Sequence, residues 1–197
     1  MNDTTRSDTT AGGQASRREA LRGRLLQGLP RGGRVAEVGV WEGAFSRRIL
    51  EICEPAELHL IDPWQYMPEF ANTGFGRKKN EFLMEEKYRA VCAMFAGDTR
   101  VHIHRATSQA ALSALPDGYL DWIYLDGNHN EPFIDQDLAL SLRKVKPKGI
   151  IAGDDYNWQA ETCGAPVRRA VEAVMAELGG KARLKLMANQ FVIALDR

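Results

Sequence analysis

Short apolar segments alternate with longer amphipathic ones along most of this chain, and this alternation constrains the fold more than any other feature. The strand-like segments are rich in β-branched and other apolar residues and cover residues 34–38, 58–61, 101–104, 122–125 and 149–152. Between them, apolar residues recur at helical spacing over residues 17–29, 44–53, 78–95, 109–115, 132–145 and 167–178. Strands that alternate with helices predict a parallel sheet covered by helices on both faces.

The end of the chain departs from this alternation. Residues 184–187 and 191–195 are apolar runs joined by a short turn, which predicts a closing antiparallel hairpin. We therefore predict an α/β fold with a Rossmann-like, seven-stranded, mostly parallel sheet, helices on both faces and a C-terminal antiparallel hairpin. The 197-residue length fits one domain over residues 17–197. Residues 1–16 are polar and are expected to form a flexible tail.

The composition excludes several classes of protein. The 26 basic residues equal the 26 acidic ones, so no net charge attracts nucleic acid or an anionic membrane. Cys53, Cys92 and Cys163 form no CxxC pair, which argues against a disulfide framework or a zinc knuckle. No apolar run has the length of a membrane span, and the N-terminus lacks the apolar core of a signal peptide. We expect a cytoplasmic protein with neither nucleic-acid nor membrane partners.

The segment VAEVGVWEG, residues 35–43, connects the first predicted strand to the next helix. Ligands of open α/β sheets bind at this kind of connection. Gly39 allows the backbone to turn and a ligand to approach, and a side chain at Gly43 would crowd the start of the helix. A dinucleotide site would need a middle glycine in G-x-G-x-x-G, and the carboxylate of Glu37 would repel a pyrophosphate. The alternative is a strand–turn–helix connection that binds nothing.

Two further strand ends favour a nucleoside ligand. Asp62 ends the second predicted strand, where a carboxylate can accept hydrogen bonds from ribose hydroxyls. The alternative for Asp62 is a turn residue before Pro63. Ser108 follows the third strand, and it either contacts a ligand or caps the next helix.

Acidic residues and a histidine follow the fourth and fifth predicted strands. Asp126 and His129 lie in DGNH, and Asp154 and Asp155 lie in DDY. Because parallel strands end on one edge of a sheet, we expect these groups to converge near the ligand site predicted at residues 35–43. Clustered carboxylates repel one another, and Mg²⁺ is a natural compensation because it takes oxygen ligands. The alternatives are a helix cap for Asp126, solvated surface acids at 154–155 and a structural histidine.

These motifs resemble those of class I S-adenosylmethionine-dependent methyltransferases. Their motif I is (D/E)-x-G-x-G-x-G, which Glu37, Gly39 and Gly43 match and in which Trp41 replaces the middle glycine. Trp41 either contacts the ligand or packs. The string YLDGNH…DLALSLRKVKPKGIIAGDDY resembles most specifically the metal-dependent macrocin-type sugar O-methyltransferases. The resemblance spans about residues 34–178.

The resemblance implies roles for the residues named above. S-adenosylmethionine would be bound by Glu37, Gly39, Trp41, Gly43, Asp62, Ser108 and Asp126. Mg²⁺ would be held by Asp126, Asp154 and Asp155. His129 would act as general base, because a metal-bound hydroxyl is more acidic and a histidine can accept its proton near neutral pH.

The implied acceptor is a hydroxyl of a small polar metabolite, such as a sugar or natural product. The aromatic loop Pro63–Gly76 is expected to form part of the acceptor pocket or a lid, and the alternative is a packed surface loop or a homodimer contact. Asn157 and Trp158 are further candidates for the acceptor site. His102 and His104 share one face of a strand and are expected to be structural. Two rival functions are a metal-independent methyltransferase and a non-catalytic S-adenosylmethionine-binding protein.

Overall fold

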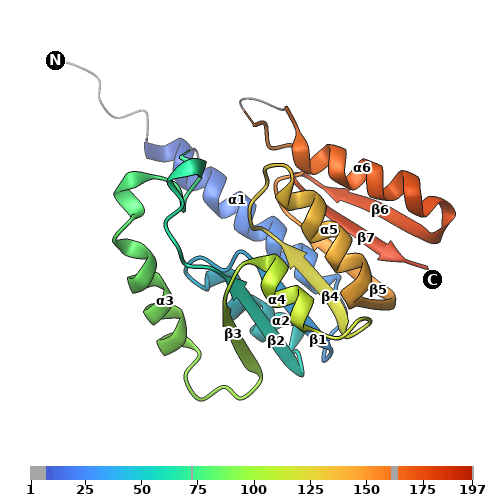
Figure 1. Ribbon diagram of the computed structural model, residues 1–197, viewed down its shortest axis with the longest axis horizontal. Helices are drawn as coiled ribbons and strands as arrows, with labels where there is room; N and C mark the ends of the chain where they lie inside the picture. Colours follow the sequence, from blue (N-terminus) through green and yellow to red (C-terminus); the bar gives the residue numbers. More distant parts are fainter. Residues whose placement is uncertain (1–7, 72, 161–163, 197) are drawn as a thin grey trace.

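The computed structural model describes residues 8–71, 73–160 and 164–196, and they form the expected α/β fold (Figure 1). The strands are β1 (Arg34–Val38), β2 (Glu57–Asp62), β3 (Val101–Arg105), β4 (Leu120–Leu125), β5 (Val145–Gly153), β6 (Ala182–Met187) and β7 (Gln190–Leu195). The helices are α1 (Asp8–Gln27), α2 (Ala44–Cys53), α3 (Leu83–Met94), α4 (Ser108–Ala114), α5 (Phe133–Lys144) and α6 (Pro166–Leu178). Short 3-10 turns occur at η1 (Pro68–Phe70), η2 (Lys78–Asn80) and η3 (Gly179–Lys181).

In the described residues the seven strands form one sheet in the order β3-β2-β1-β4-β5-β7-β6. The first five strands are parallel, and β7 runs antiparallel to both β5 and β6. The predicted sheet and closing hairpin are therefore confirmed. The chain winds outward from β1 to β3 and then crosses back to β4 beside β1. This reversal places a ligand-binding crevice at the carboxyl ends of β1 and β4.

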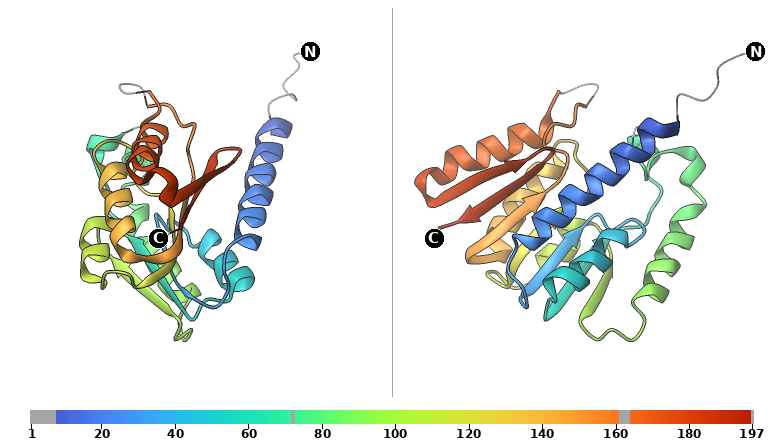
Figure 2. Two further views of the ribbon diagram at one scale, coloured as in Figure 1. Left: turned by 90° about the vertical axis from the view of Figure 1, so that its right-hand side faces the viewer. Right: turned by 180° about the vertical axis from the view of Figure 1, so that it is seen from behind.

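The sheet separates two hydrophobic cores. One core contains buried residues of α4, α5 and α6, such as Leu112, Leu138 and Val171. The other contains buried residues of α1, α2 and α3, such as Leu26, Ile49 and Val91. Figure 2 shows these two helical layers on opposite sides of the sheet. The helical spacing of the apolar residues thus buries one stripe of each helix against a face of the sheet.

Helix α1 begins nine residues earlier than expected. We predicted a helix over residues 17–29 after a polar tail, and the structure starts the helix at Asp8. Thr and Asp, whose polarity predicts a tail, are also common at the starts of helices. Residues 1–7 of the expected tail lie outside the described residues. In the described ranges, no helix combines the length and apolarity that crossing a membrane requires.

Two other boundaries differ from the prediction. The helix predicted over 78–95 divides into η2 and α3, and Phe82 between them is 84% exposed. Strand β5 begins at Val145 rather than at Gly149, because the KPKG segment interrupts the pairing with β4 without ending the strand. Pairing stops after Leu120–Val145 and resumes at Trp122–Ile150. Lys148 has φ 63°, so the turn signal in the sequence marks an irregularity inside the strand.

The described cysteines are free thiols. Cys53 is fully buried in the α1–α2–α3 core, which confirms the prediction that it acts as a small hydrophobic residue. Cys92 is partly buried on α3. Cys163 lies outside the described residues.

Candidate active site

A largely apolar cavity lies at the carboxyl ends of the central strands. Its lining comes from the ends of β1 and β2, from the loops after them, and from the start of α4 and the loop after β4. The lining residues are Val38, Gly39, Trp41, Ile61, Asp62, Pro63, Met67, Phe75, Met84, Thr107, Ser108, Gln109, Gly127, Asn128 and Phe133. Four of the predicted cofactor residues, Gly39, Trp41, Asp62 and Ser108, are therefore brought together around one space.

Glycine is required at the two motif positions for different structural reasons. Gly39 has φ 87°, and a Cβ there would lie 2.1 Å from the carbonyl oxygen of Asp126. Only glycine therefore lets the end of β1 lie against the end of β4. Gly43 has φ 76° just before α2, and a Cβ there would lie 3.2 Å from the ring of Phe95 and 3.3 Å from the sulfur of Met94. The close contacts at Gly43 are therefore with side chains at the end of α3, rather than with the start of α2 as predicted.

Asp62 holds the loop between β1 and α2 in place. One carboxylate oxygen accepts hydrogen bonds from the backbone N–H groups of Val40 and Trp41, each at 3.0 Å. The other accepts from the backbone N–H of Trp64 at 2.7 Å. Burial raises the pKa of Asp62, although these three hydrogen bonds favour its charged form. Asp62 faces the cavity, and its ribose role remains a prediction.

Trp41 packs against neighbouring groups and also lines the cavity, and its contact with a ligand stays a prediction. Its backbone has φ 56°. The ammonium group of Lys87 lies 4.2 Å from the centre of the indole ring, and a Cβ on Gly74 would lie 3.3 Å from the ring edge. The backbone oxygen of Trp41 accepts a hydrogen bond from the indole N–H of Trp64 at 2.8 Å. Trp41 therefore connects α3 and the Pro63–Gly76 loop to the loop between β1 and α2.

Glu37 lies on strand β1 and is 1% exposed. Its carboxyl oxygen accepts a hydrogen bond from the hydroxyl of Ser46 on α2 at 2.5 Å. Burial raises the pKa of Glu37 to about 8, although the Ser46 hydrogen bond opposes this shift. Three other predicted cofactor residues, Glu37, Gly43 and Asp126, are not among the described residues that line the cavity. The sequence did not point to Ser46, because nothing in the pattern distinguishes a buried hydroxyl on α2.

The start of α4 corrects one alternative for Ser108. Thr107 is the residue before the helix, and its hydroxyl accepts a hydrogen bond from the backbone N–H of Ala110 at 3.3 Å. Thr107 is therefore the cap, and Ser108 is the first residue of α4 and faces the cavity. Gln109 also lines the cavity, and its amide donates to the buried carboxyl of Asp137 at 3.3 Å. Sequence reasoning missed Gln109 and Asp137.

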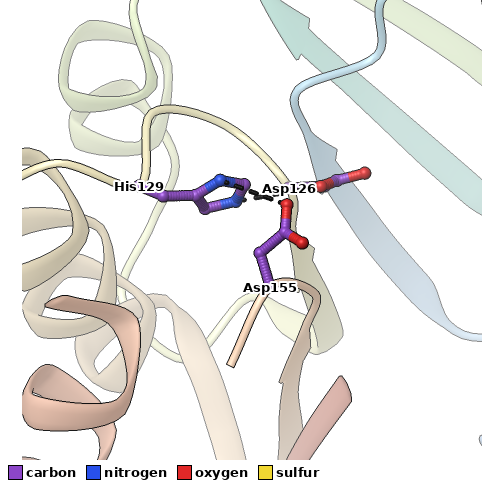
Figure 3. Close-up of side chains that lie close together, drawn as sticks. All are labelled: Asp126, His129 and Asp155. Atoms are coloured by element: carbon purple, nitrogen blue, oxygen red, sulfur yellow. Dashed lines mark ion pairs between the residues drawn. The ribbon is translucent and has the colours of Figure 1, made fainter. Parts of the chain in front are cut away.

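Asp126, His129 and Asp155 come together beyond the ends of β4 and β5 (Figure 3). The Nδ1 atom of His129 lies 3.4 Å from a carboxylate oxygen of Asp155, and its Nε2 atom lies 3.8 Å from one of Asp126. Asp155 has φ 58°, and its other oxygen accepts a hydrogen bond from the amide of Asn189 at 2.8 Å. The expected convergence of the ends of β4 and β5 therefore brings together three of the four predicted groups.

Asp154 occupies a different position from its neighbour. It is 1% exposed, and its Oδ1 atom accepts a hydrogen bond from the backbone N–H of Asp155 at 2.9 Å. Its Oδ2 atom faces two guanidinium groups of α1, those of Arg18 and Arg22. The sequence did not indicate these arginines, because helical spacing predicts a helix without saying which part of the sheet edge it meets.

The charges around Asp126 and Asp154 shift their ionisation in opposite directions. Burial raises the pKa of Asp126 to about 6, although Arg22 opposes this shift. Burial would also raise the pKa of Asp154, but Arg22 and Arg18 together hold it below its ordinary value. Arg22 lies over the ring of Phe45 at 5.1 Å, so packing as well as charge fixes its position.

The cluster has the donors that a divalent cation needs. One ligand atom from each of Asp126, His129 and Asp155 lies within 4.8 Å of the others. The Nε2 atom of His129 is buried and has no hydrogen-bond partner among the described residues. Carboxylate oxygens suit Mg²⁺ or Mn²⁺, so Asp126 and Asp155 fit such an ion.

The aromatic residues near the site mostly pack against one another. Pro63, Met67 and Phe75 of the long loop line the cavity, and Trp64 is 1% exposed. Trp158 lies beside His129, with ring centres 5.9 Å apart. Trp158 therefore packs directly beside the cluster.

His102 and His104 lie far from this cluster in the sheet, on strand β3 at its edge. Their rings lie 4.9 and 5.2 Å from the ring of His59 on β2. This packing supports the structural role expected for them. His59 itself was not noticed in the sequence, since the partner strand was needed to place it.

Comparison with known proteins gives one family and many structures of the same fold. Residues 36–156 match the family model described as a methyltransferase domain. No sequence among curated proteins matches this chain. The O-methyltransferase NovP is 20% identical, with a TM-score of 0.63 over 92% of this chain and 80% of NovP. A Corynebacterium glutamicum protein is 15% identical, with a TM-score of 0.63 over 98% of this chain and 93% of that one.

A spermidine synthase from Thermotoga maritima also shares the fold. It is 13% identical, with a TM-score of 0.56 over 87% of this chain and 55% of that protein. At these identities the structural matches show the fold alone. The family assignment depends on the methyltransferase-domain family model, which matches more than half of the chain. The chain therefore belongs to the methyltransferase-domain family, as a class I enzyme that uses S-adenosylmethionine.

Proposed function

We propose that this methyltransferase acts on a hydroxyl of a small polar acceptor, such as a sugar or a natural product, with the help of a divalent cation. The observation that carries the proposal is the position of the Asp126–His129–Asp155 cluster. Gly127 and Asn128, between Asp126 and His129 in the chain, line the cofactor cavity. A base and two carboxylates thus lie directly beside the space where the methyl donor binds.

In the proposed reaction the acceptor oxygen attacks the sulfonium methyl group. The new oxygen–carbon bond forms as the carbon–sulfur bond breaks, which gives a methyl ether and S-adenosylhomocysteine. His129 takes the proton that the hydroxyl loses, since it is the one basic side chain in the cluster. The site's main task is to hold oxygen, methyl carbon and sulfur close and in line. Trp158 contributes to the acceptor side because it lies beside the His129 ring.

Asp126 and Asp155 would hold the cation, with His129 within reach of both. A bound Mg²⁺ would orient the acceptor and make its hydroxyl more acidic. Asp154 supports the site from behind through its hydrogen bond with the backbone of Asp155. Of the predicted set, Asp126 and Asp155 would hold the cation beside His129, whereas Asp154 is 1% exposed and is paired most closely with Arg18 and Arg22 of α1. We place this reaction in the cytoplasm, with a single chain or a homodimer as the acting form.

The test is a methyl-transfer assay with labelled S-adenosylmethionine and a panel of sugars and glycosylated natural products, with Mg²⁺ and with a chelator. We expect His129→Ala to lower turnover about 100-fold or more while S-adenosylhomocysteine affinity changes less than about threefold. His102→Ala, on the remote edge strand, is the matched control and should turn over normally. Normal turnover by His129→Ala would show that His129 is not the base.

Two results would favour the rival functions. Transfer that proceeds equally with Mg²⁺ and with a chelator would support the metal-independent methyltransferase. Binding of S-adenosylhomocysteine without transfer to any acceptor of the panel would support a non-catalytic S-adenosylmethionine-binding protein.

A further inference from the structure

Helix α1 brings two arginines onto the acidic cluster. Arg18 and Arg22 are one helical turn apart, so both side chains leave the same face of α1. Their partners, Asp126, Asp154 and Asp155, come from the ends of β4 and β5, more than 100 positions away in the chain. Neither arginine belongs to the motifs of the cofactor site.

Arg22 is the more deeply placed of the two. Its Nη2 atom donates to a carboxylate oxygen of Asp126 and, at 2.6 Å, to Oδ2 of Asp154. Its Nε atom donates to the same Asp154 oxygen at 2.9 Å. Its side chain is 17% exposed, so these ion pairs are poorly screened by solvent.

Arg18 is half-exposed and spans all three acids. It donates to Oδ2 of Asp154 at 2.9 Å, and its Nη2 atom lies 3.6 Å from Asp155 and 3.9 Å from Asp126. Both arginines therefore pair with Asp154 and reach Asp126, and Arg18 alone also reaches Asp155.

The charge balance of the cluster disfavours a further positive group. Three carboxylates carry a charge of −3, and two guanidinium groups carry +2. A divalent cation added to this set would be repelled by both arginines at short range. If the arginines moved away, the same cation would replace their full charge of +2.

The attachment of α1 permits such a movement. Leu25, Leu26 and Leu29 anchor the end of α1 and the residues after it in the core. Residues 17–20 are exposed, so the part of α1 that carries Arg18 has little apolar packing, and Arg22 rests on the ring of Phe45 through its side chain alone. A cavity of about 440 Å³ lies between Arg17, Arg18 and Leu21 of α1 and the β6–β7 turn, next to Asp154 and Asp155. Figure 2 shows α1 as a long helix along one side of the sheet.

We propose that Arg18 and Arg22 are displaceable counter-ions that compete with a divalent cation for Asp126 and Asp155. Cation binding releases the part of α1 that carries them and opens the cluster to the acceptor. Without the cation, α1 covers the cluster and keeps its charges paired. This inference rests on the proposed metal-assisted function and adds a regulatory element to the same site.

The first experiment measures Mn²⁺ binding by titration calorimetry, in the absence of S-adenosylmethionine. We expect the double variant Arg18→Gln/Arg22→Gln to bind Mn²⁺ at least about tenfold more tightly than the wild type. Arg24→Gln is the matched control. Arg24 is exposed on the same helix, and its replacement removes one positive charge, as each single replacement of Arg18 or Arg22 does. Arg18→Gln alone, which removes a half-exposed side chain, should show a smaller increase.

The second experiment needs no variant and so does not depend on the double variant folding. Amide hydrogen exchange over residues 17–22 of the wild type should become faster when Mn²⁺ saturates the site. Affinity of the double variant within twofold of the wild type, or exchange unchanged by Mn²⁺, would overturn the proposal. Absence of Mn²⁺ binding to every form would overturn it together with the metal-assisted function. Titration with S-adenosylhomocysteine, measured separately, tests the cofactor site alone.

Discussion

Asp62 is the carboxylate on which the geometry of the cofactor loop depends, since three backbone N–H groups donate to it. Replacement by alanine leaves those donors without a partner in a buried place. We expect Asp62→Ala to lower the free energy of unfolding by at least about 2 kcal/mol, measured by urea denaturation. Affinity for S-adenosylhomocysteine should fall at least about tenfold. Glu42→Ala, an exposed residue of the same loop, should change neither, and equal loss in both variants would refute the special role of Asp62.

Glu37 gives the fold a specific pH dependence. Its pKa in the folded protein is about 8, and its ordinary value is 4.5. Between these values the folded state holds a proton that the unfolded chain has lost, so this group's contribution to stability falls as pH rises from about 5 to 8. We expect wild type to lose stability relative to Glu37→Gln by at most about 1.4 kcal/mol per pH unit. Urea denaturation at several pH values measures this, and a constant difference would contradict it.

Single residues differed in how far the sequence could place them. Gly39, Trp41, Asp62 and Ser108 occur in recognisable positions at strand ends, and all four line the cavity. Ser46 and Asp137 could not be found in this way, because a buried polar side chain on a helix becomes significant only when its partner is known. The depth of Glu37 was also invisible, since the strand pattern gives the face of a residue but not what covers it.

On strands β2 and β3, His59 makes a contribution to stability whose pH dependence is opposite to that of Glu37. His59 is 6% exposed and lies against His102 and His104, and burial first and these neighbours second lower its pKa to about 4. The unfolded chain binds a proton near pH 6.5, while the folded state does not until about pH 4. Stability from this group is therefore complete above pH 6.5 and is lost as pH falls towards 4.

A variant isolates this effect. We expect the stability of wild type relative to His59→Gln to fall between pH 6.5 and 4, by at most about 1.4 kcal/mol per pH unit. The His102→Gln variant tests the neighbouring, exposed ring and should keep most of the wild-type pH dependence. A parallel pH dependence of wild type and His59→Gln would mean that His59 is not the group responsible.

Most helices and strands could be predicted because their apolar spacing is regular. Strand β1 matches the predicted bounds, and the hairpin β6–β7 was expected from its two apolar runs. The exceptions have local causes, such as the KPKG turn signal that interrupts β5 without ending it. The position of α1 could not be predicted, because its arginines meet acids from strands β4 and β5 only in the folded chain.

At the scale of the whole molecule, the winding of the sheet brings the site together. The reversal between β1 and β4 creates the crevice, and the close approach at Gly39 brings the end of β4 against the cofactor loop. Two motifs 87 positions apart, around Gly39 and Asp126, therefore share one edge. The sequence predicted this convergence from the alternating pattern alone, but not that an N-terminal helix covers the acidic side of it.

The central claim is that the cavity and the Asp126–His129–Asp155 cluster form one active site. A crystal structure of the protein with S-adenosylhomocysteine tests this most directly. We predict the adenosine in the cavity, with its ribose towards Asp62 and its sulfur facing His129. Adenosine bound outside this cavity, or a sulfur directed away from the cluster, would contradict the account.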